Sequence, residues 1–277
     1  MSEEKGLVVR PVERLKAMIN VDSVKEQFQK SMKENSDLFT ASLIELYTND
    51  ASLQECDPKL IIAEALKAAT MRLPLSKQLG QAWIIPYKKN NVPIPQFQIG
   101  YKGWIQIALR SQQYRRLHAT PVYEGQQVHI NYNMGDIIIS GNSASKTEIG
   151  YFCYFELLNG FSHSLYMTYD EMTKYAEKYS PAFAGKWKEK SKWFTDRTAM
   201  ALKTVVKQNL SHWGYVSIEM AAAMSYDNEE PEMESSVMVQ AEPVQEERPR
   251  KKKETRVITA EAVVEETPAP EYDDAPY

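Results

Sequence analysis

Apolar residues recur at a helical spacing through the first part of the chain. Between Val12 and Tyr47, apolar side chains such as Val24, Phe28 and Met32 return every fourth position within segments rich in Lys, Glu and Gln. Because residues four apart lie on the same face of an α-helix, this spacing predicts two amphipathic helices. The apolar face of each predicted helix requires a partner.

A further helix is predicted from Asp57 to about Arg72. Asp57 followed by Pro58 has the form of an N-cap residue and a proline in the first helical position. Apolar residues continue the helical spacing up to Pro74, and proline lacks the backbone N–H that a helix interior requires. The predicted helix therefore ends just before Pro74.

A β-hairpin and then a central helix are predicted between Gln81 and Tyr114. Two apolar segments, residues 81–87 and 94–99, flank a polar turn at residues 88–91, which is the pattern of a hairpin. Residues 101–114 then have helical spacing. Their polar side chains form one narrow stripe, which indicates a mostly buried helix: Lys102, Gln106, Arg110 and Gln113.

Strand-like segments between Leu117 and Thr168 are rich in β-branched and aromatic residues and are separated by Gly and Asn turns. They are residues 119–123, 127–132, 136–140, 148–158 and 162–168. An antiparallel meander is the simplest assembly of these strands. Helical spacing returns in residues 170–179, 191–209 and 218–224. The expected fold class is α+β, with an antiparallel β-hairpin and meander packed against a central helix and flanking helices.

The balance of charge changes after Ser225. Residues 1–225 hold 27 Lys and Arg against 22 Asp and Glu, whereas residues 226–277 hold six against fifteen. The second segment has too little apolar surface to offset the entropy cost of ordering, so it is predicted to be a disordered acidic tail. Residues 1–225 are predicted to form one folded domain, with its N-terminal helices at about residues 12–47.

The folded part contains a long segment without acidic residues. From Ala65 to Tyr123 there is no Asp or Glu, while nine Lys and Arg residues are mixed with seven aromatic residues. Cations bind phosphates and flat rings stack on unpaired bases. This acid-free run therefore predicts binding of single-stranded nucleic acid.

A second basic segment follows at Lys174–Trp213, where nine basic residues face three acidic ones and aromatic residues are interleaved. Surface charge runs are usually solvated, and this one is equally compatible with a mobile clamp over a ligand. We expect the two basic segments to line one groove that holds the phosphate backbone. Charge and spacing add Arg115, Arg116, Lys192 and Arg197 to the candidate DNA-binding residues.

Motifs for catalysis are not recognisable in the sequence. The P-loop pattern is absent, since the Gly185–Lys186 pair lacks the earlier glycine and the following Ser or Thr. Asp170 and Glu171 are interpreted as the cap of a helix. One alternative remains a metal-dependent nuclease whose carboxylates converge in the fold: Glu124, Asp136, Glu156 or Asp170. An RNA-binding module is a second alternative.

Cysteine usage and hydropathy indicate the compartment. Cys56 and Cys153 are far apart and form no C-x-x-C pair, so neither a disulfide framework nor a zinc cluster is predicted. No run of eighteen apolar residues occurs. We expect a soluble, cytoplasmic protein with no membrane partner.

Three ordered blocks of the sequence resemble one protein family. These blocks are Leu75–Tyr87, Gln96–Ser111, and Trp193 together with Ala199–Lys207. They resemble the RecT family of phage and prophage recombinases, over about residues 11–225 and with the tail outside the match.

The resemblance implies a protein that anneals single-stranded DNA in homologous recombination, without ATP, and that promotes strand exchange. It implies an α+β fold broadly like that of eukaryotic Rad-type annealing proteins. It also implies a ring or helical filament of identical subunits in the cytoplasm of a bacterial host, with the N-terminal amphipathic helices packing on the next subunit. The implied partners are single-stranded DNA, the annealed duplex intermediate and an exonuclease. No cofactor is implied, and magnesium is expected only to modulate DNA binding.

Candidate DNA-binding residues follow from positions within the matching blocks. They are Lys77, Gln78, Gln81, Tyr101, Lys102, Arg110, Ser111, Lys203, Thr204 and Lys207. In the tail, Arg248–Lys253 has the composition of a nuclear signal or an extra DNA contact, but we favour the interpretation that it is an unstructured charge run. Asp273–Tyr277 is similar to the acidic tip of bacterial single-strand-binding proteins. The host single-strand-binding protein, or its partners, is therefore a further candidate partner.

Overall fold

The computed structural model describes residues 10–89, 92–133, 135–186 and 188–228. All of them belong to one structural unit. Of the tail predicted to be disordered, residues 226–277, the described part is residues 226–228, which belong to a helix. The rest of the tail, with Arg248–Lys253 and Asp273–Tyr277, lies outside the described residues. These interpretations stay predictions.

Helices form the first part of the described chain. They are Pro11–Ile19 (α1), Asp22–Met32 (α2), the 3-10 helix Lys33–Asn35 (η1), Ser36–Thr48 (α3), Ala51–Gln54 (α4) and Pro58–Thr70 (α5). The segment expected to contain two helices therefore holds three α-helices. The second break follows from Lys33, whose positive φ of 51° cannot continue an α-helix.

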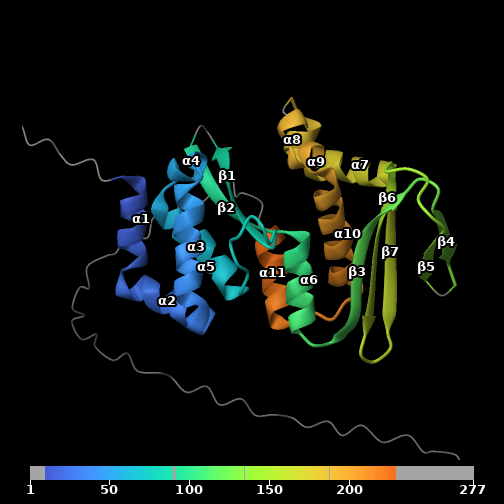
Figure 1. The fold of residues 1–277 in the computed structure, drawn as a ribbon, viewed down its shortest axis with the longest axis horizontal. Coiled ribbons are helices and arrows are strands. Elements are labelled where there is room, and N and C mark those ends of the chain that lie inside the picture. The colour runs from blue at the N-terminus through green and yellow to red at the C-terminus, as the bar shows by residue number, and fades with distance from the viewer. Residues whose placement is uncertain (1–9, 90–91, 134, 187, 229–277) are drawn as a thin grey trace, which may run out of the picture. The chain divides into compact units, whose positions relative to one another are not determined.

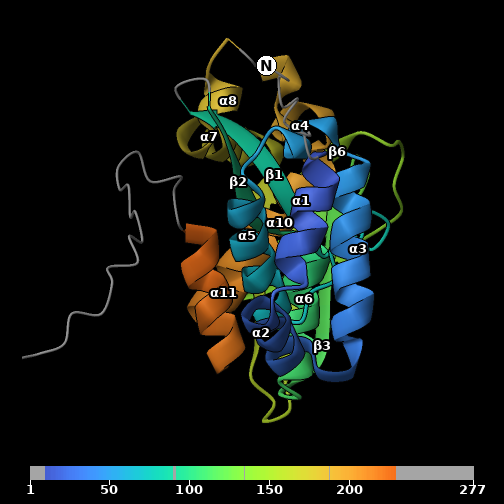
Figure 2. The same ribbon diagram turned by 90° about the vertical axis from the view of Figure 1, so that its left-hand side faces the viewer.

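The apolar faces of α1 and α2 are buried within the same chain. Leu15 and Phe28 are fully buried, and both helices pack against α3 and α5. In Figure 2, α1 lies between α5 and α3. The partner that these faces require is therefore the chain's own helical layer, rather than a neighbouring subunit as expected.

Local signals place α5 where the sequence predicts it. The Asp57 carboxylate accepts a hydrogen bond of 2.9 Å from the backbone N–H of Lys59, and Pro58 occupies the first turn. The helix ends at Thr70, and Arg72 then adopts a positive φ of 50°. The predicted cap and the end before Pro74 are confirmed.

The predicted β-hairpin consists of Ala82–Lys89 (β1) and Val92–Ile99 (β2), which pair antiparallel. The Glu64 carboxylate of α5 accepts a 2.7 Å hydrogen bond from the backbone N–H of Phe97, which fixes the hairpin to the helical layer. The central helix follows as Tyr101–Arg110 (α6). It ends earlier than expected because Gln112 adopts a positive φ of 57° and a strand begins at Tyr114.

A three-stranded antiparallel sheet follows, in the order β3-β6-β7. Its strands are Tyr114–Tyr123 (β3), Glu148–Leu157 (β6) and Ser162–Thr168 (β7). The strands Gln127–Asn131 (β4) and Asp136–Ser140 (β5) pair only with each other. The fold class is confirmed, but the five strands do not form one meander, because the β4–β5 hairpin is inserted between two strands that pair.

Burial explains why β6, rather than β4, takes the place beside β3. Residues 150–153 of β6 are buried without alternation, whereas β4 is largely exposed. A strand with both faces covered belongs in the centre of a sheet. Backbone hydrogen bonds from Glu124 to Thr147 and from Ala144 to Glu124 then close the base of the inserted segment.

The remaining helices are Tyr169–Tyr179 (α7), Pro181–Ala184 (α8), Lys188–Lys190 (η2, a 3-10 helix), Lys192–Thr195 (α9), Arg197–Trp213 (α10) and Ile218–Asn228 (α11). Thr168 and Glu171 form a capping box at the start of α7, which confirms the interpretation of the acidic pair as a helix cap. The long predicted helix is split at Asp196, where the backbone leaves helical geometry.

Helix α10 is central to the arrangement of layers. It packs against all three strands of the sheet on one side and against α6 on the other (Figure 1). Its buried positions include Ala201, Val205 and Leu210. Helix α11 packs on β2 and α6 and continues to Asn228, past the predicted domain boundary. Throughout the described residues, no helix combines the length and the apolar composition needed to cross a membrane.

Candidate nucleic-acid interface

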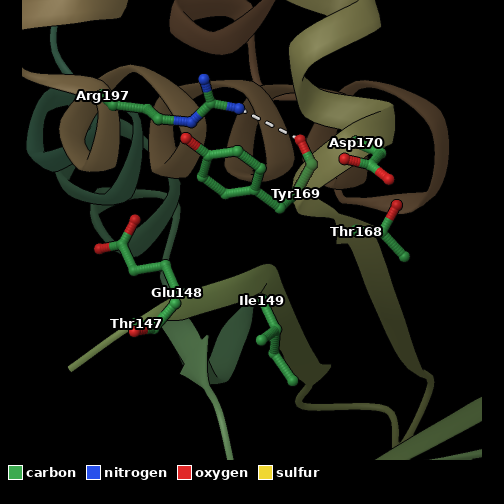
Figure 3. Close-up of a pocket in the computed structure, with 7 residues that line it drawn as sticks. All are labelled: Thr147, Glu148, Ile149, Thr168, Tyr169, Asp170 and Arg197. Carbon is green, nitrogen blue, oxygen red and sulfur yellow. Dashed lines mark hydrogen bonds between the residues drawn. The ribbon is translucent and has the colours of Figure 1, made fainter. Parts of the chain in front are cut away.

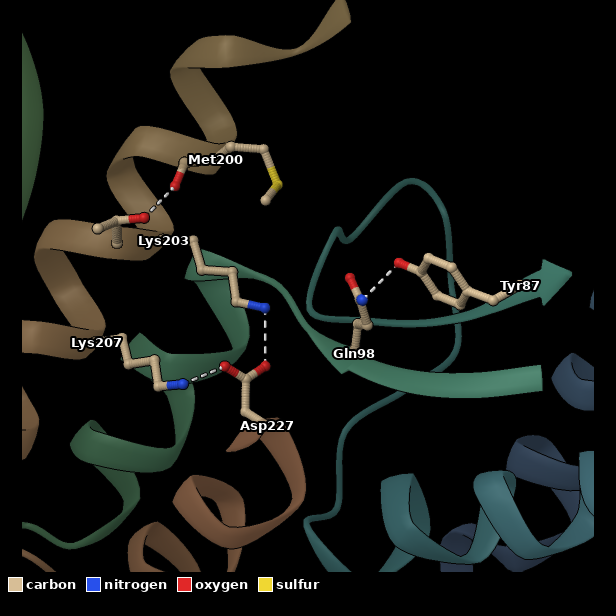
Figure 4. A network of polar contacts seen from close by, with 7 residues as sticks. Tyr87, Gln98, Met200, Lys203, Lys207 and Asp227 are labelled. Atoms are coloured by element: carbon tan, nitrogen blue, oxygen red, sulfur yellow. Dashed lines mark hydrogen bonds and ion pairs between the residues drawn. The ribbon is translucent and has the colours of Figure 1, made fainter. Parts of the chain in front are cut away.

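Two predicted DNA-binding lysines on α10 share one carboxylate of α11. Lys203 Nζ lies 2.8 Å from Asp227 Oδ1, and Lys207 Nζ lies 2.7 Å from Asp227 Oδ2. Figure 4 shows both lysines pointing from one face of α10 toward the end of α11. The side chains of Lys203, Lys207 and Asp227 are 16%, 23% and 7% exposed. We call these three residues the lysine cluster.

Aromatic side chains lie near the lysine cluster. Lys207 Nζ lies 5.9 Å from the ring centre of Trp104 on α6, and the ring of Tyr226 receives Lys67 of α5 at 5.6 Å. Burial raises the pKa of Tyr87. The hydrogen bond that Gln98 donates to the Tyr87 hydroxyl lowers this pKa, and the Asp227 carboxylate raises it. The cluster thus lies where α5, β1, α6, α10 and α11 meet.

Lys102 lies at the N-terminal end of α6, beside the turn that follows α5. A Cβ built on Gly80 would lie 3.8 Å from the Lys102 side chain, so the turn and the helix start are in contact. A Cβ on Gly100 would lie 2.3 Å from the Gly80 carbonyl oxygen. Gly100 therefore permits close packing of backbone on backbone, which is a structural reason for this glycine. Lys102 itself is exposed.

Arg110 lies at the other end of α6 and holds the loop after α5. Its guanidinium donates hydrogen bonds to the carbonyl oxygens of Met71, at 2.5 Å, and Arg72, at 3.1 Å. Burial lowers the pKa of Arg110, and the neighbouring Arg72 contributes in the same direction. The hydroxyl of Ser111 donates to the carbonyl of Ala108. These interactions give both residues a part in the local fold.

Arg115 and Arg116 at the start of β3 share the carboxylate of Glu156 on β6. The distances are 2.8 Å from Arg115 Nη1 to Glu156 Oε1 and 3.7 Å from Arg116 Nε to Glu156 Oε2. The arginine side chains are 55% and 72% exposed, and that of Glu156 is 16% exposed. We call these three residues the arginine cluster.

Arg197 lines a pocket of about 540 Å³ at the start of α10 (Figure 3). Its guanidinium carbon lies 3.8 Å from the ring centre of Tyr169, and Nη2 donates to the Tyr169 carbonyl and the Thr173 hydroxyl. Glu148, on the opposite side of the pocket, accepts hydrogen bonds from Tyr151 and Thr198. Arg197 is thus anchored to α7 and is not part of the lysine cluster.

The other predicted residues are distributed over the turn after α5, the start of α6, α9 and α10. Lys77 Nζ lies 3.8 Å from Asp50 Oδ2, and the Gln81 carbonyl accepts from the backbone N–H of Gly100. Thr204 is buried and donates to the Met200 carbonyl. Gln78 and Lys192 are exposed, and Tyr101 is half-buried. The DNA-binding role of every candidate stays a prediction.

The acid-free run does not produce a surface of one sign. Carboxylates from outside it lie against several of its cations: Glu64 on Lys67, Asp50 on Lys77, and Glu156 on Arg115 and Arg116. Asp227 likewise lies against Lys203 and Lys207 of the second basic segment. Sequence reasoning missed Asp227 because it assigned that residue to the tail. The signal was present, since Met220, Ala223 and Asp227 continue one helical spacing.

The carboxylates considered for a nuclease do not form a metal centre in the described part of the chain. Among the described residues, no group of three or more His, Cys, Asp or Glu side chains is arranged to hold a metal ion. Glu156 binds the arginine cluster and Glu124 accepts from Ser145. Asp170 lines the Arg197 pocket.

Comparison with known proteins gives one family and two relatives. The model of the RecT family matches residues 37–252. An uncharacterized protein of Bacillus subtilis (strain 168), YqaK, is 38% identical over 237 residues, which cover 83% of this chain and 80% of that protein. Protein RecT of Escherichia coli (strain K12) is 24% identical over 225 residues, which cover 78% and 80%. The family match extends past Ser225, so the expectation that the whole tail lies outside the resemblance is wrong.

Proposed function

Because the chain belongs to the RecT family, we propose that it anneals complementary DNA strands without ATP and promotes strand exchange. Membership of this family supports DNA binding, single-strand annealing and a role in DNA recombination. The single observation that carries the proposal is the family match over residues 37–252. In the proposed reaction the protein coats one strand, presents its bases, and pairs it with a complementary strand.

Binding in this proposal depends on phosphates rather than on base identity. An annealing protein must accept any complementary pair, and phosphate contacts carry no sequence information. The lysine cluster, the arginine cluster and Lys102 supply cations on several elements, and the neighbouring Trp104 and Tyr87 are aromatic. These cations are proposed to hold the backbone while the base edges remain accessible.

We propose a homo-oligomer, as a ring or a helical filament, that works with an exonuclease supplying single strands and with the host single-strand-binding protein in the bacterial cytoplasm. No ATP and no catalytic group take part, and magnesium modulates only DNA binding. Sedimentation with and without single-stranded DNA tests assembly, and a monomer under both conditions contradicts it.

An annealing experiment with two complementary labelled strands tests the function. The strands are added in sequence, with the protein bound to the first, and pairing is followed by fluorescence without ATP. We expect pairing faster than the spontaneous rate and unchanged by ATP. No acceleration contradicts annealing, and shortened strands after incubation with magnesium support the nuclease alternative. Preference for RNA over DNA strands of the same sequence supports the RNA-binding alternative.

Salt dependence tests the phosphate contacts. If about five cations neutralise phosphates in each site, log affinity for single strands falls with log salt at a slope of about −3.5. Fluorescence anisotropy at several salt concentrations measures this slope. An affinity independent of salt contradicts an electrostatic interface.

A further inference from the structure

We propose that Asp227 occupies the position of a DNA phosphate between Lys203 and Lys207, so that the last turn of α11 competes with DNA for this site. The inference rests on the proposed function, since it concerns how the DNA site is regulated. It is carried by the geometry of the lysine cluster and by the place of Asp227 in its helix.

The lysine cluster has the charge and geometry of an anion site. Two ammonium groups one helical turn apart approach the two oxygens of a single carboxylate at 2.8 and 2.7 Å. These are the distances of charge-assisted hydrogen bonds, which phosphate oxygens also form with lysine. The two ammonium groups and the carboxylate lie together in a largely buried location. A phosphate can therefore replace the carboxylate on the same donors.

Helix stability does not explain an acidic residue at this position. Asp227 lies in the last turn of α11, which contains no basic residue. The C-terminal end of a helix carries partial negative charge, so it favours cations and disfavours a carboxylate. The favourable interactions of Asp227 are those with the two lysines of α10. The carboxylate thus stabilises the docking of the helix end rather than the helix itself.

The last turn of α11 can separate while the rest of the helix stays packed. Met220 and Ala223, in the earlier turns, are fully buried in the core, whereas Tyr226 is half-buried and packs against the edge of the core, with Lys67 over its ring. Helix ends open at lower free energy than packed interiors. DNA entering between the lysines would then displace Asp227 together with its turn, without unfolding α11.

Binding of a fluorescein-labelled DNA single strand to the full chain tests the inference, with the Asp227→Asn variant compared to the natural sequence by anisotropy. We expect binding about tenfold tighter for the variant, the factor that corresponds to about 1.4 kcal/mol. Glu13→Gln is the matched control, because it removes one carboxylate from an exposed pair with Lys16 on α1. The control is expected to bind as the natural sequence does.

Unchanged or weaker binding by a folded Asp227→Asn variant overturns the inference, as does an equal gain in the Glu13→Gln control. If neither the natural sequence nor the variants bind DNA, the proposed function fails instead.

Hydrogen exchange measured on the natural sequence tests the same inference, and it requires no substituted protein. We expect DNA to speed exchange of the backbone amides in residues 225–228, while those of residues 220–223 remain protected. Slower exchange, or no change, at the last turn when DNA is bound contradicts displacement of Asp227.

Discussion

The lysine cluster and the arginine cluster have the same charges but opposite surroundings. In each, one carboxylate lies between two cations predicted to bind DNA. The lysines are 16% and 23% exposed and their carboxylate belongs to the end of a helix, whereas the arginines are 55% and 72% exposed and their carboxylate belongs to the central strand of a sheet. The anion is therefore the replaceable partner in the first cluster, and the cations are the movable partners in the second.

The comparison shows that a count of cations does not measure the availability of a phosphate site. Exposed arginines can turn from Glu156 toward a phosphate at little cost, because exposed ion pairs contribute only about 0.2–1 kcal/mol. Buried lysines lose their partner only when another anion takes its place, since an uncompensated buried charge is costly. The arginine cluster is thus suited to first contact with DNA, and the lysine cluster to a bound state that excludes Asp227.

The largest expected effect is on stability when Asp227 is removed. Asp227→Ala removes a carboxylate that two lysines share in a largely buried place, so we expect the free energy of unfolding to fall by about 3 kcal/mol. Glu156→Ala, the matched change in the arginine cluster, is expected to lower it by about 1 kcal/mol or less, because its cations are exposed. Urea unfolding measures both values. Equal losses in the two variants would remove the distinction between the clusters.

A second effect is on DNA binding when the arginines are neutralised. Arg115→Gln combined with Arg116→Gln removes two exposed cations, so we expect the slope of log affinity against log salt to become less steep by about 1.4, at about 0.7 per contact. Anisotropy titrations over a range of salt concentrations measure this slope. The free energy of unfolding should remain nearly unchanged.

A matched control for the arginine variant is Lys16→Gln combined with Lys30→Gln. These lysines are also exposed and paired with carboxylates, but on α1 and α2. We expect the control to leave the salt slope unchanged. The same change of slope in the control would show that net charge, rather than the arginine cluster, determines binding.

Local elements of this fold could be predicted because their causes are local. The cap at Asp57, the β1–β2 hairpin and the capping box at Glu171 depend on residues within a few positions of one another. The pairing of β3 with β6 could not be predicted in this way. It depends on which distant strand can bury both faces, and the inserted β4–β5 hairpin hides that relation along the sequence.

The candidate site was predictable in its cations but not in their partners. Runs of Lys and Arg are visible in the sequence, whereas Glu156 and Asp227 reach those cations only through the fold. The charge boundary at Ser225 also assigned Asp227 to the tail, although α11 continues to Asn228. The partners of Arg110 could not be predicted for the same reason, because its hydrogen bonds to the carbonyls of Met71 and Arg72 join segments that are distant along the chain.

The smallest expected effect is the change in DNA affinity when Glu156 is neutralised, compared with the change when Asp227 is neutralised. Glu156→Gln releases arginines that already face solvent, so binding of single strands should tighten by less than about threefold, which corresponds to less than about 0.7 kcal/mol. Asp227→Asn releases lysines that solvent hardly reaches, and a larger gain is expected there. Anisotropy titrations of both variants at one salt concentration make the comparison. If Glu156→Gln gives the larger gain, Glu156 is the stronger competitor with DNA and the roles of the two clusters are reversed.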